Sequence, residues 1–226
     1  MIRRTALLLA CLAATPARAQ VTPADPVPAG TPAPVASPTP APTPRPGTVR
    51  VALVTDRGRI VLELERAKAP ITTANFLRYV DQKRLDGTVF YRAVKPAPSF
   101  GFVQFGVQNE ARRVLPPIAL ETTTQTGVTH TDGAISLARL AANSGRGDFT
   151  INVGDQPSLD AGTGNPADNL GYAAFGHVVE GMDVVKTILD ARIDPAKGPF
   201  KGETIAAPVR LVSARRVPLP APAPGG

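Results

Sequence analysis

Few residues in this sequence are of the types that perform acid–base or nucleophilic chemistry. The two histidines, His130 and His177, lie in different regions, and we expect both at the surface rather than as metal ligands. Ser136 and His177 could be combined with an aspartate into a Ser–His–Asp triad, but no Gly-x-Ser-x-Gly elbow supports a nucleophilic serine. The single cysteine, Cys11, excludes both an internal disulfide and a cysteine-based zinc site.

Two short motifs also resemble functional sequences, and both are interpreted as loops. Gly162-Thr163-Gly164 does not stand between a strand and a helix, as a phosphate-binding loop must. Arg146-Gly147-Asp148 spells an adhesion tripeptide, but three residues recur by chance, and we expect a loop that enters a strand. Taken alone, the residues therefore indicate a domain without an evident nucleophile, metal site or nucleotide site.

Composition and charge narrow the function classes further. The 226 residues include 25 Lys and Arg against 18 Asp and Glu, a net charge of +7. The basic residues are scattered and form no run that could follow a phosphate backbone, so no nucleic-acid partner is predicted. No apolar run reaches the roughly 20 residues of a membrane span, and we expect a monomer.

The N-terminal segment 1–19 has the form of a secretory signal peptide. A basic start precedes an apolar run, and Ala17-Arg18-Ala19 fits a cleavage site before Gln20. Lipoprotein processing at Cys11 is a rival interpretation, and a buried N-terminal helix is another. Cleavage would remove three arginines and the only cysteine, lowering the net charge from +7 to +4. A cysteine-free mature chain suits an oxidising compartment, because no thiol can mispair there.

Proline marks the domain boundaries. Segment 20–47 holds ten of the 25 prolines and should form an extended, solvated polyproline spacer, because proline fixes φ and lacks an N–H. This spacer could be a stalk or a leader without a specific role. Segment 218–226 is predicted to be a similar disordered, proline-rich tail, which leaves 48–217 as one domain.

Within that domain, alternating apolar residues predict mostly strands. Val49–Thr55 and Arg59–Leu64 form a hairpin, because their apolar residues recur at every second position. Apolar stripes predict helices over Pro70–Asp81 and Met182–Ala191. Further strands are expected at Thr88–Val94, Phe102–Val107, Ile118–Leu120, Gly133–Leu137, Asp148–Val153, Ala174–Val179 and Val209–Val217. Eight or nine short strands with two helices favour an antiparallel barrel whose ends the helices close.

Motifs along 48–217 resemble those of the cyclophilin family, in the family's order. Phe90-Tyr91-Arg92 leads into Gly101-Phe102-Val103-Gln104-Phe105-Gly106, which is similar to the family's signature. The other matching segments are 69–76, 133–138, 159–160, 171–176 and 180–185. The resemblance implies a closed eight-stranded antiparallel barrel capped by two α-helices, and the leader makes the chain look like a bacterial periplasmic member.

The activity implied by this resemblance is peptidyl-prolyl cis–trans isomerisation. Amide resonance sets a rotation barrier of about 18–20 kcal/mol, and uncatalysed X–Pro bonds turn over in tens to hundreds of seconds. Rotation makes the prolyl nitrogen basic, so a donor aimed at it acts more strongly in the transition state. By motif position Arg92 is the expected donor, since its guanidinium is always charged and rigid. No cofactor is expected.

The resemblance also implies a site for proline-containing polypeptides. Phe102, Leu159 and Tyr172 are expected to surround the proline ring, together with Thr150. Gln104 and the main chain near Ala138 and Arg139 are expected to bind the peptide backbone. By motif position, the residues expected to bind substrate are therefore Phe102, Gln104, Ala138, Arg139, Thr150, Leu159 and Tyr172.

This sequence departs from the family pattern around the pocket. Thr150 replaces a phenylalanine, Asp148 a glutamine, Phe105 a glycine, and Ser158 a bulky neighbour of Leu159. An insertion also leaves Phe100 and Phe102 competing for the first aromatic position. A threonine hydroxyl in an apolar pocket costs affinity unless it is hydrogen-bonded. The alternatives are therefore a prolyl-peptide-binding, chaperone-like module with weak or no isomerase activity, and a purely structural barrel.

Overall fold

The computed structural model describes residues 45–164 and 166–218. The expected signal peptide, most of the proline-rich spacer and nearly all of the tail lie outside these ranges. The first strand begins at Val49 and the last ends at Arg216. In the described ranges, no helix is both long enough and apolar enough to cross a membrane.

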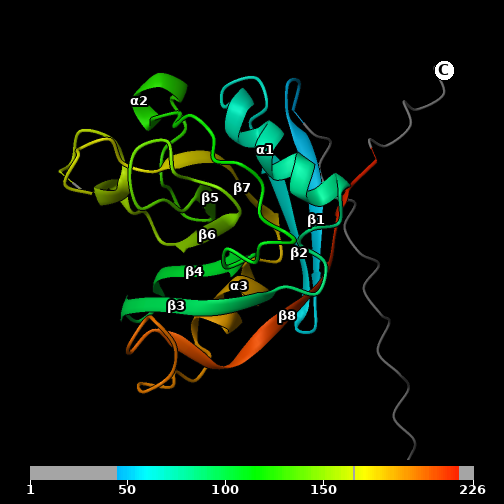
Figure 1. The fold of residues 1–226 in the computed structure, drawn as a ribbon, viewed down its shortest axis with the longest axis vertical. Helices are drawn as coiled ribbons and strands as arrows, with labels where there is room; N and C mark the ends of the chain where they lie inside the picture. Colours follow the sequence, from blue (N-terminus) through cyan, green and yellow to red (C-terminus); the bar gives the residue numbers. More distant parts are fainter. Residues whose placement is uncertain (1–44, 165, 219–226) are drawn as a thin grey trace, which may run out of the picture. The chain divides into compact units, whose positions relative to one another are not determined.

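Eight antiparallel strands close into a barrel in the order β1-β2-β7-β5-β6-β4-β3-β8 (Figure 1). Two larger helices, α1 (Pro70–Asp81) and α3 (Met182–Leu189), pack against it. The strands are β1 (Val49–Thr55), β2 (Gly58–Leu64), β3 (Val89–Ala97), β4 (Phe100–Gly106), β5 (Ala134–Leu137), β6 (Asp148–Val153), β7 (Ala173–Glu180) and β8 (Thr204–Arg216). The predicted closed eight-stranded barrel with two helices is thus confirmed.

Both helices turn an apolar stripe toward the barrel. Phe76 of α1 and Ile188 of α3 are fully buried in the core. Proline occupies the first turn of α1, where its missing N–H costs nothing. The carboxylate of Glu121 accepts the N–H of Ile71 at 2.9 Å and the N–H of Thr72 at 2.7 Å, which caps this helix from a distant loop. An acidic cap at a helix N-terminus also complements the helix dipole.

Aromatic side chains fill the middle of the barrel. The Phe76 and Phe149 ring centroids lie 4.8 Å apart, edge to face, and those of Phe90 and Phe105 lie 4.7 Å apart. The Phe105 and Phe149 centroids are 5.8 Å apart, and all four rings are fully buried. Phe90, the first residue of the Phe90-Tyr91-Arg92 motif, therefore belongs to the core.

One predicted strand is wrong. Ile118–Leu120 has no regular secondary structure and pairs with no strand. The N–H of Ile118 bonds the carbonyl of Gly145 at 3.1 Å, and the N–H of Leu120 bonds the side chain of Asn143 at 2.8 Å. These partners lie in a loop, so the segment runs beside the 138–147 loop instead of joining the ladder.

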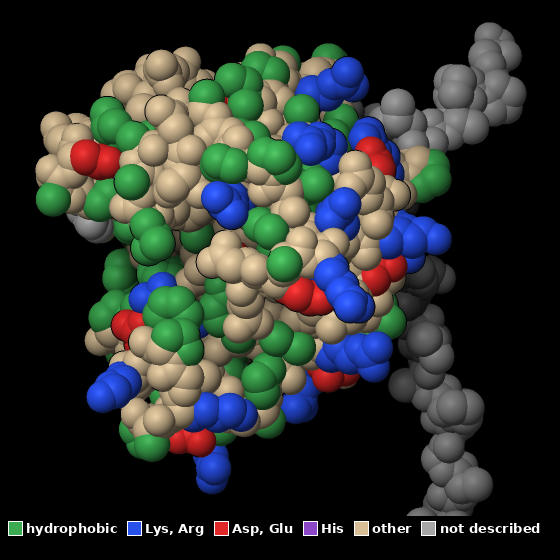
Figure 2. All heavy atoms as spheres, viewed as in Figure 1, with side chains coloured by type: hydrophobic (Ala, Val, Ile, Leu, Met, Phe, Trp, Pro, Cys, Tyr) green, Lys and Arg blue, Asp and Glu red, His purple; other side chains and the backbone are tan. Residues whose placement is uncertain are grey.

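Two short helices were not expected, and one predicted strand is longer than its pattern. α2 (Thr123–Thr126) and the 3-10 turn η1 (Pro157–Leu159) each span about one turn. β8 begins at Thr204, five residues before its predicted start. On the face shown in Figure 2, Lys and Arg side chains are spread out, with Asp and Glu between them.

Candidate active site

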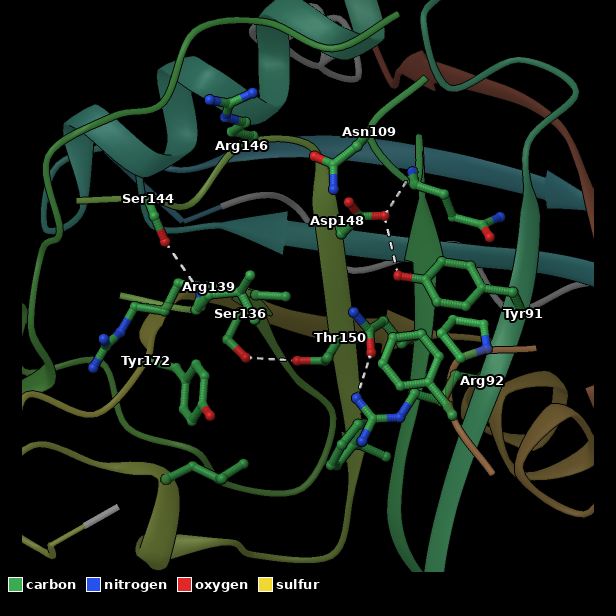
Figure 3. Close-up of a pocket in the computed structure, with 18 residues that line it drawn as sticks. Tyr91, Arg92, Asn109, Ser136, Arg139, Ser144, Arg146, Asp148, Thr150 and Tyr172 are labelled. Carbon is green, nitrogen blue, oxygen red and sulfur yellow. Dashed lines mark hydrogen bonds between the residues drawn. The ribbon is translucent and has the colours of Figure 1, made fainter. Parts of the chain in front are cut away.

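A cleft of about 680 Å³ opens on the outer face of β3, β4, β5 and β6 (Figure 3). All eight residues predicted for the site line it: Arg92, Phe102, Gln104, Ala138, Arg139, Thr150, Leu159 and Tyr172. The structure therefore brings together residues that lie up to 80 positions apart in the sequence. Their roles in binding and catalysis stay predictions.

Strand register places four of the lining residues side by side. Arg92 pairs with Gln104 across β3 and β4, Gln104 with Thr150 across β4 and β6, and Thr150 with Ser136 across β6 and β5. We call these four residues the polar row. Because side chains alternate along a strand, the next residue on each of β4, β5 and β6 points into the barrel instead.

Arg92 is held at one end of the polar row. Its Nη1 donates to Oε1 of Gln104 at 2.9 Å, and its Nε donates to Oε2 of Glu203 at 2.7 Å. The guanidinium carbon also lies 4.3 Å from the ring centroid of Phe200 and 5.4 Å from that of Phe102. Its side chain is 23% exposed, so the charged fork reaches the cleft while its surroundings fix its position.

The apolar part of the cleft is formed by Phe102, Leu159 and Tyr172. Leu159 and Tyr172 come from separate segments that are joined by a hydrogen bond from the Tyr172 N–H to the Leu159 carbonyl at 3.0 Å. Gly171 permits this approach, because a Cβ there would lie 2.7 Å from the Leu159 carbonyl oxygen, and its φ is +62°. Of the two competing aromatics, Phe102 lines the cleft, whereas Phe100 lies beside Gly154.

Arg139 contributes a buried side chain as well as main chain. Its guanidinium binds both carboxylate oxygens of Asp168, at 2.6 and 2.7 Å, and the carbonyl of Gly171 at 2.8 Å. The hydrogen bonds from Arg139 lower the pKa of Asp168. The guanidinium carbon of Arg139 lies 5.5 Å from the ring centroid of Tyr172. Arg139 therefore packs against Tyr172, which forms one wall of the apolar pocket. The preceding Ala138 is fixed by its N–H, which donates to the Asp148 carbonyl at 2.9 Å.

The Thr150 hydroxyl has a partner. Its Oγ1 lies 2.8 Å from Oγ of Ser136, within hydrogen-bonding distance, so the polar group that replaces an aromatic ring is satisfied. Phe105 does not compensate for the missing ring, because it is fully buried in the barrel and packs against Phe90. Strand alternation places Phe105 on the opposite face from Gln104, so its ring does not enter the cleft.

Asp148 brings a carboxylate to the far end of the cleft. Its Oδ1 accepts the Tyr91 hydroxyl at 3.1 Å and the Gln108 N–H at 2.9 Å. Burial raises the pKa of Asp148, although both of these hydrogen bonds oppose the shift. Burial, followed by the nearby Asp148 charge, also raises the pKa of Tyr91, so its hydroxyl stays protonated and donates.

His130 is not the surface residue that the sequence suggested. It is 1% exposed, and its Nδ1 lies 2.7 Å from Oδ1 of Asp160. Burial lowers the pKa of His130, and the Asp160 carboxylate opposes this only in part. The pair fixes the turn that presents Leu159, so its effect on the cleft is structural. His177 is half-buried in β7.

Several cleft residues were missing from the sequence-based prediction. Strand alternation could have revealed Ser136, two residues before Ala138 and on the same face. Pro199 and Phe200 come from the loop before β8, more than 90 residues from Arg92, and no motif marks them. Among residues 45–164 and 166–218, no group of three or more His, Cys, Asp or Glu side chains is placed to hold a metal ion.

Comparison with known proteins agrees with this geometry. The family model described as cyclophilin type peptidyl-prolyl cis-trans isomerase/CLD matches residues 50–213. The chain therefore belongs to the cyclophilin-type peptidyl-prolyl isomerases, and it is an enzyme of that class.

Particular relatives give the extent of the similarity. The chain is 36% identical over 149 residues to a peptidyl-prolyl cis-trans isomerase of Streptomyces antibioticus, which covers 66% of this chain and 87% of that protein. It is 32% identical over 171 residues to peptidyl-prolyl cis-trans isomerase A of Dickeya dadantii, covering 74% and 84% of the two chains. A cyclophilin-type isomerase of Cryptosporidium parvum has the same fold, with a TM-score of 0.62 at 18% identity, covering 76% of this chain and 99% of that one.

Proposed function

We propose that this isomerase turns X–Pro bonds in exported polypeptides outside the cytoplasm, with Arg92 as the donor to the prolyl nitrogen. The observation that carries the proposal is the Arg92 guanidinium, fixed at the cleft wall beside the apolar pocket of Phe102, Leu159 and Tyr172. A proline ring in that pocket would place its nitrogen within reach of the guanidinium. The donor is then already oriented when the nitrogen becomes basic, which lowers the barrier to rotation.

Each part of the cleft has a separate task in this proposal. The apolar pocket holds the proline ring and thereby selects prolyl substrates. Gln104, on the same row as Arg92, binds the peptide backbone and at the same time holds Nη1 of the arginine. The guanidinium has five N–H groups, more than its bonds to Gln104 and Glu203 use, so donors remain for substrate.

A solved relative supports the kind of ligand. The Cryptosporidium parvum isomerase has also been crystallised in the presence of the dipeptide Ala-Pro, with a TM-score of 0.59 to this chain over 74% of its length and 97% of the other. We propose that this cleft likewise takes a short prolyl segment. Its polar row then lies along the peptide, and its apolar pocket receives the proline.

The catalytic role is tested by Arg92→Ala. Losing one preorganised donor should lower kcat/KM on a prolyl tetrapeptide by about 10²-fold. Arg59→Ala is the matched control: Arg59 also forms a carboxylate ion pair, 2.6 Å from Glu180, but lies outside the cleft. It should leave activity unchanged. Near-wild-type activity of Arg92→Ala would remove Arg92 from the mechanism, and weak activity of the wild-type domain itself would favour the peptide-binding alternative.

The export role is tested on the protein as the cell makes it. The basic and apolar leader with Ala17-Arg18-Ala19 supports export, and mass spectrometry of the periplasmic fraction should show an N-terminus at or near Gln20. Mature protein that begins at a lipid-modified Cys11 would establish the lipoprotein alternative. Protein that retains Met1 in the cytoplasm would contradict export altogether, without bearing on Arg92.

A further inference from the structure

The loop between α3 and β8 returns to the cleft and contacts the back of Arg92. Oε2 of Glu203 lies 2.7 Å from Nε and 2.6 Å from Nη2 of the guanidinium. The main chain of the same residue is also tied to β3, because its carbonyl accepts the Ala93 N–H at 2.9 Å. Glu203 therefore reaches the arginine from a position fixed by the backbone.

A second residue of this loop covers the face of the guanidinium. The Phe200 ring centroid lies 4.3 Å from the Arg92 guanidinium carbon and 6.0 Å from the Tyr91 ring, with which it stacks. The loop's shape is held by the Thr204 hydroxyl, which donates to the Phe200 carbonyl at 3.0 Å, and by the Glu203 N–H, which donates to the same carbonyl at 3.0 Å. An arginine over an aromatic face gains a cation–π attraction in addition to its hydrogen bonds.

We propose that Glu203 is a positioning residue for isomerisation, acting through Arg92 and not through the substrate. Gln104 holds one edge of the guanidinium and Glu203 the other, while Phe200 fixes its plane. An arginine side chain without hydrogen-bond partners samples many rotamers. Ordering this side chain in each turnover would slow the reaction. The carboxylate removes that freedom before substrate arrives. This inference rests on the proposed role of Arg92.

The same carboxylate could instead weaken the donor, because a negative charge beside the guanidinium reduces its electrostatic effect on the prolyl nitrogen. Removing the carboxylate would slow the enzyme if positioning of Arg92 dominates, and would speed it up if the charge effect dominates. Glu203 is 34% exposed, so solvent screens its charge, whereas the geometry of its hydrogen bonds is unaffected by screening. Positioning therefore outweighs charge, and removal of Glu203 should slow the enzyme.

The first test compares Glu203→Ala with Glu203→Gln. Glu203→Ala should lower kcat by roughly tenfold with little change in KM, because orientation acts mainly in the transition state. Glu203→Gln keeps an oxygen acceptor and should retain most of the wild-type kcat. Since the Ala93–Glu203 backbone bond survives both changes, the loop stays in place, and thermal unfolding should confirm this. Glu180→Ala breaks an ion pair outside the cleft and should leave kcat unchanged.

The second test removes Glu203 in the absence of Arg92. Glu203→Ala should have no further effect on kcat/KM when added to Arg92→Ala, because a positioning residue has nothing left to position. An equal loss in both backgrounds would show a general structural role and overturn the inference. So would a Glu203→Ala variant as fast as, or faster than, the wild type, or a Glu203→Gln variant as slow as Glu203→Ala. If Arg92→Ala alone kept full activity, the catalytic role of Arg92 would fail first.

Discussion

The inner and outer faces of β4 and β6 differ in what their side chains contact. On the inner face, Phe105 and Phe149 are fully buried and lie beside each other in the register. On the outer face of the same strands, Gln104 and Thr150 pair in the cleft. Consecutive residues thus line the core and the cleft in turn, because side chains alternate along a strand.

This separation explains how the sequence tolerates unusual residues on both faces. Phe105, where the family resemblance leads one to expect glycine, adds a ring to the aromatic core and does not reach the cleft. Thr150, where a phenylalanine is expected, changes only the cleft and finds its partner in Ser136. The two changes therefore do not compensate for each other, and each can be altered independently.

The largest expected effect comes from the inner face. Phe105→Ala removes a fully buried ring that contacts two others, and should lower the free energy of unfolding by about 3–5 kcal/mol. Phe102→Ala, on the outer face of the same strand, should change stability much less but reduce kcat/KM, because Phe102 lines the apolar part of the cleft that we propose takes the proline ring. Urea unfolding and the isomerase assay on both variants measure the two effects. Equal stability losses would contradict the separation of faces.

Much of this contrast could be predicted from the sequence. The bounds of β1, β6 and α1 could be predicted to the residue, because apolar residues alternate along the two strands and form a stripe along the helix. Motif order gave all eight proposed site residues, and these line one cleft.

What the sequence could not provide were contacts between segments distant in the chain. Glu203 and Phe200 reach Arg92 only because the loop before β8 folds back on β3. The burial of His130 depends on Asp160, which lies 30 residues away. Ile118–Leu120 has the composition of a strand, but its hydrogen bonds go to a loop, and composition does not reveal where a partner lies.

A smaller effect is expected from filling the outer face. Because Phe105 does not occupy the cleft, Thr150→Phe should place a ring against the substrate proline. About 50–80 Å² of added apolar contact corresponds to roughly 1–2 kcal/mol, or about tenfold in kcat/KM. The isomerase assay on a prolyl tetrapeptide measures this increase.

The control concerns Ser136, which loses its hydrogen-bond partner in the Thr150→Phe variant. Ser136 is 2% exposed and bonds Thr150, so losing that bond should cost about 1–3 kcal/mol of stability. The double variant Ser136→Ala/Thr150→Phe should recover much of that stability and keep the higher activity. If Thr150→Phe left the activity unchanged, Thr150 would not contact the proline ring.

The smallest effect separates two carboxylates by the way each changes stability with pH: Asp148, which lines the cleft, and Asp168, which pairs with Arg139. Burial raises the pKa of Asp148, so ionising this carboxyl lowers the free energy of unfolding. This loss of stability is absent at acidic pH, below the ordinary carboxyl pKa of about 4. It grows as the pH rises through the raised pKa. Asp148→Asn keeps an oxygen acceptor for Tyr91 and Gln108 and should therefore raise Tm at pH 7, with the difference disappearing near pH 3 to 4.

For Asp168, hydrogen bonds from Arg139 lower the pKa, so its stabilisation is present at neutral pH and is lost on acidification. Asp168→Asn should accordingly lower Tm at pH 7, which is the opposite of the change expected for Asp148→Asn. Thermal unfolding from pH 3 to pH 7 measures both changes. A shift of Tm in the same direction in both variants would contradict the opposite pKa shifts of the two carboxyls.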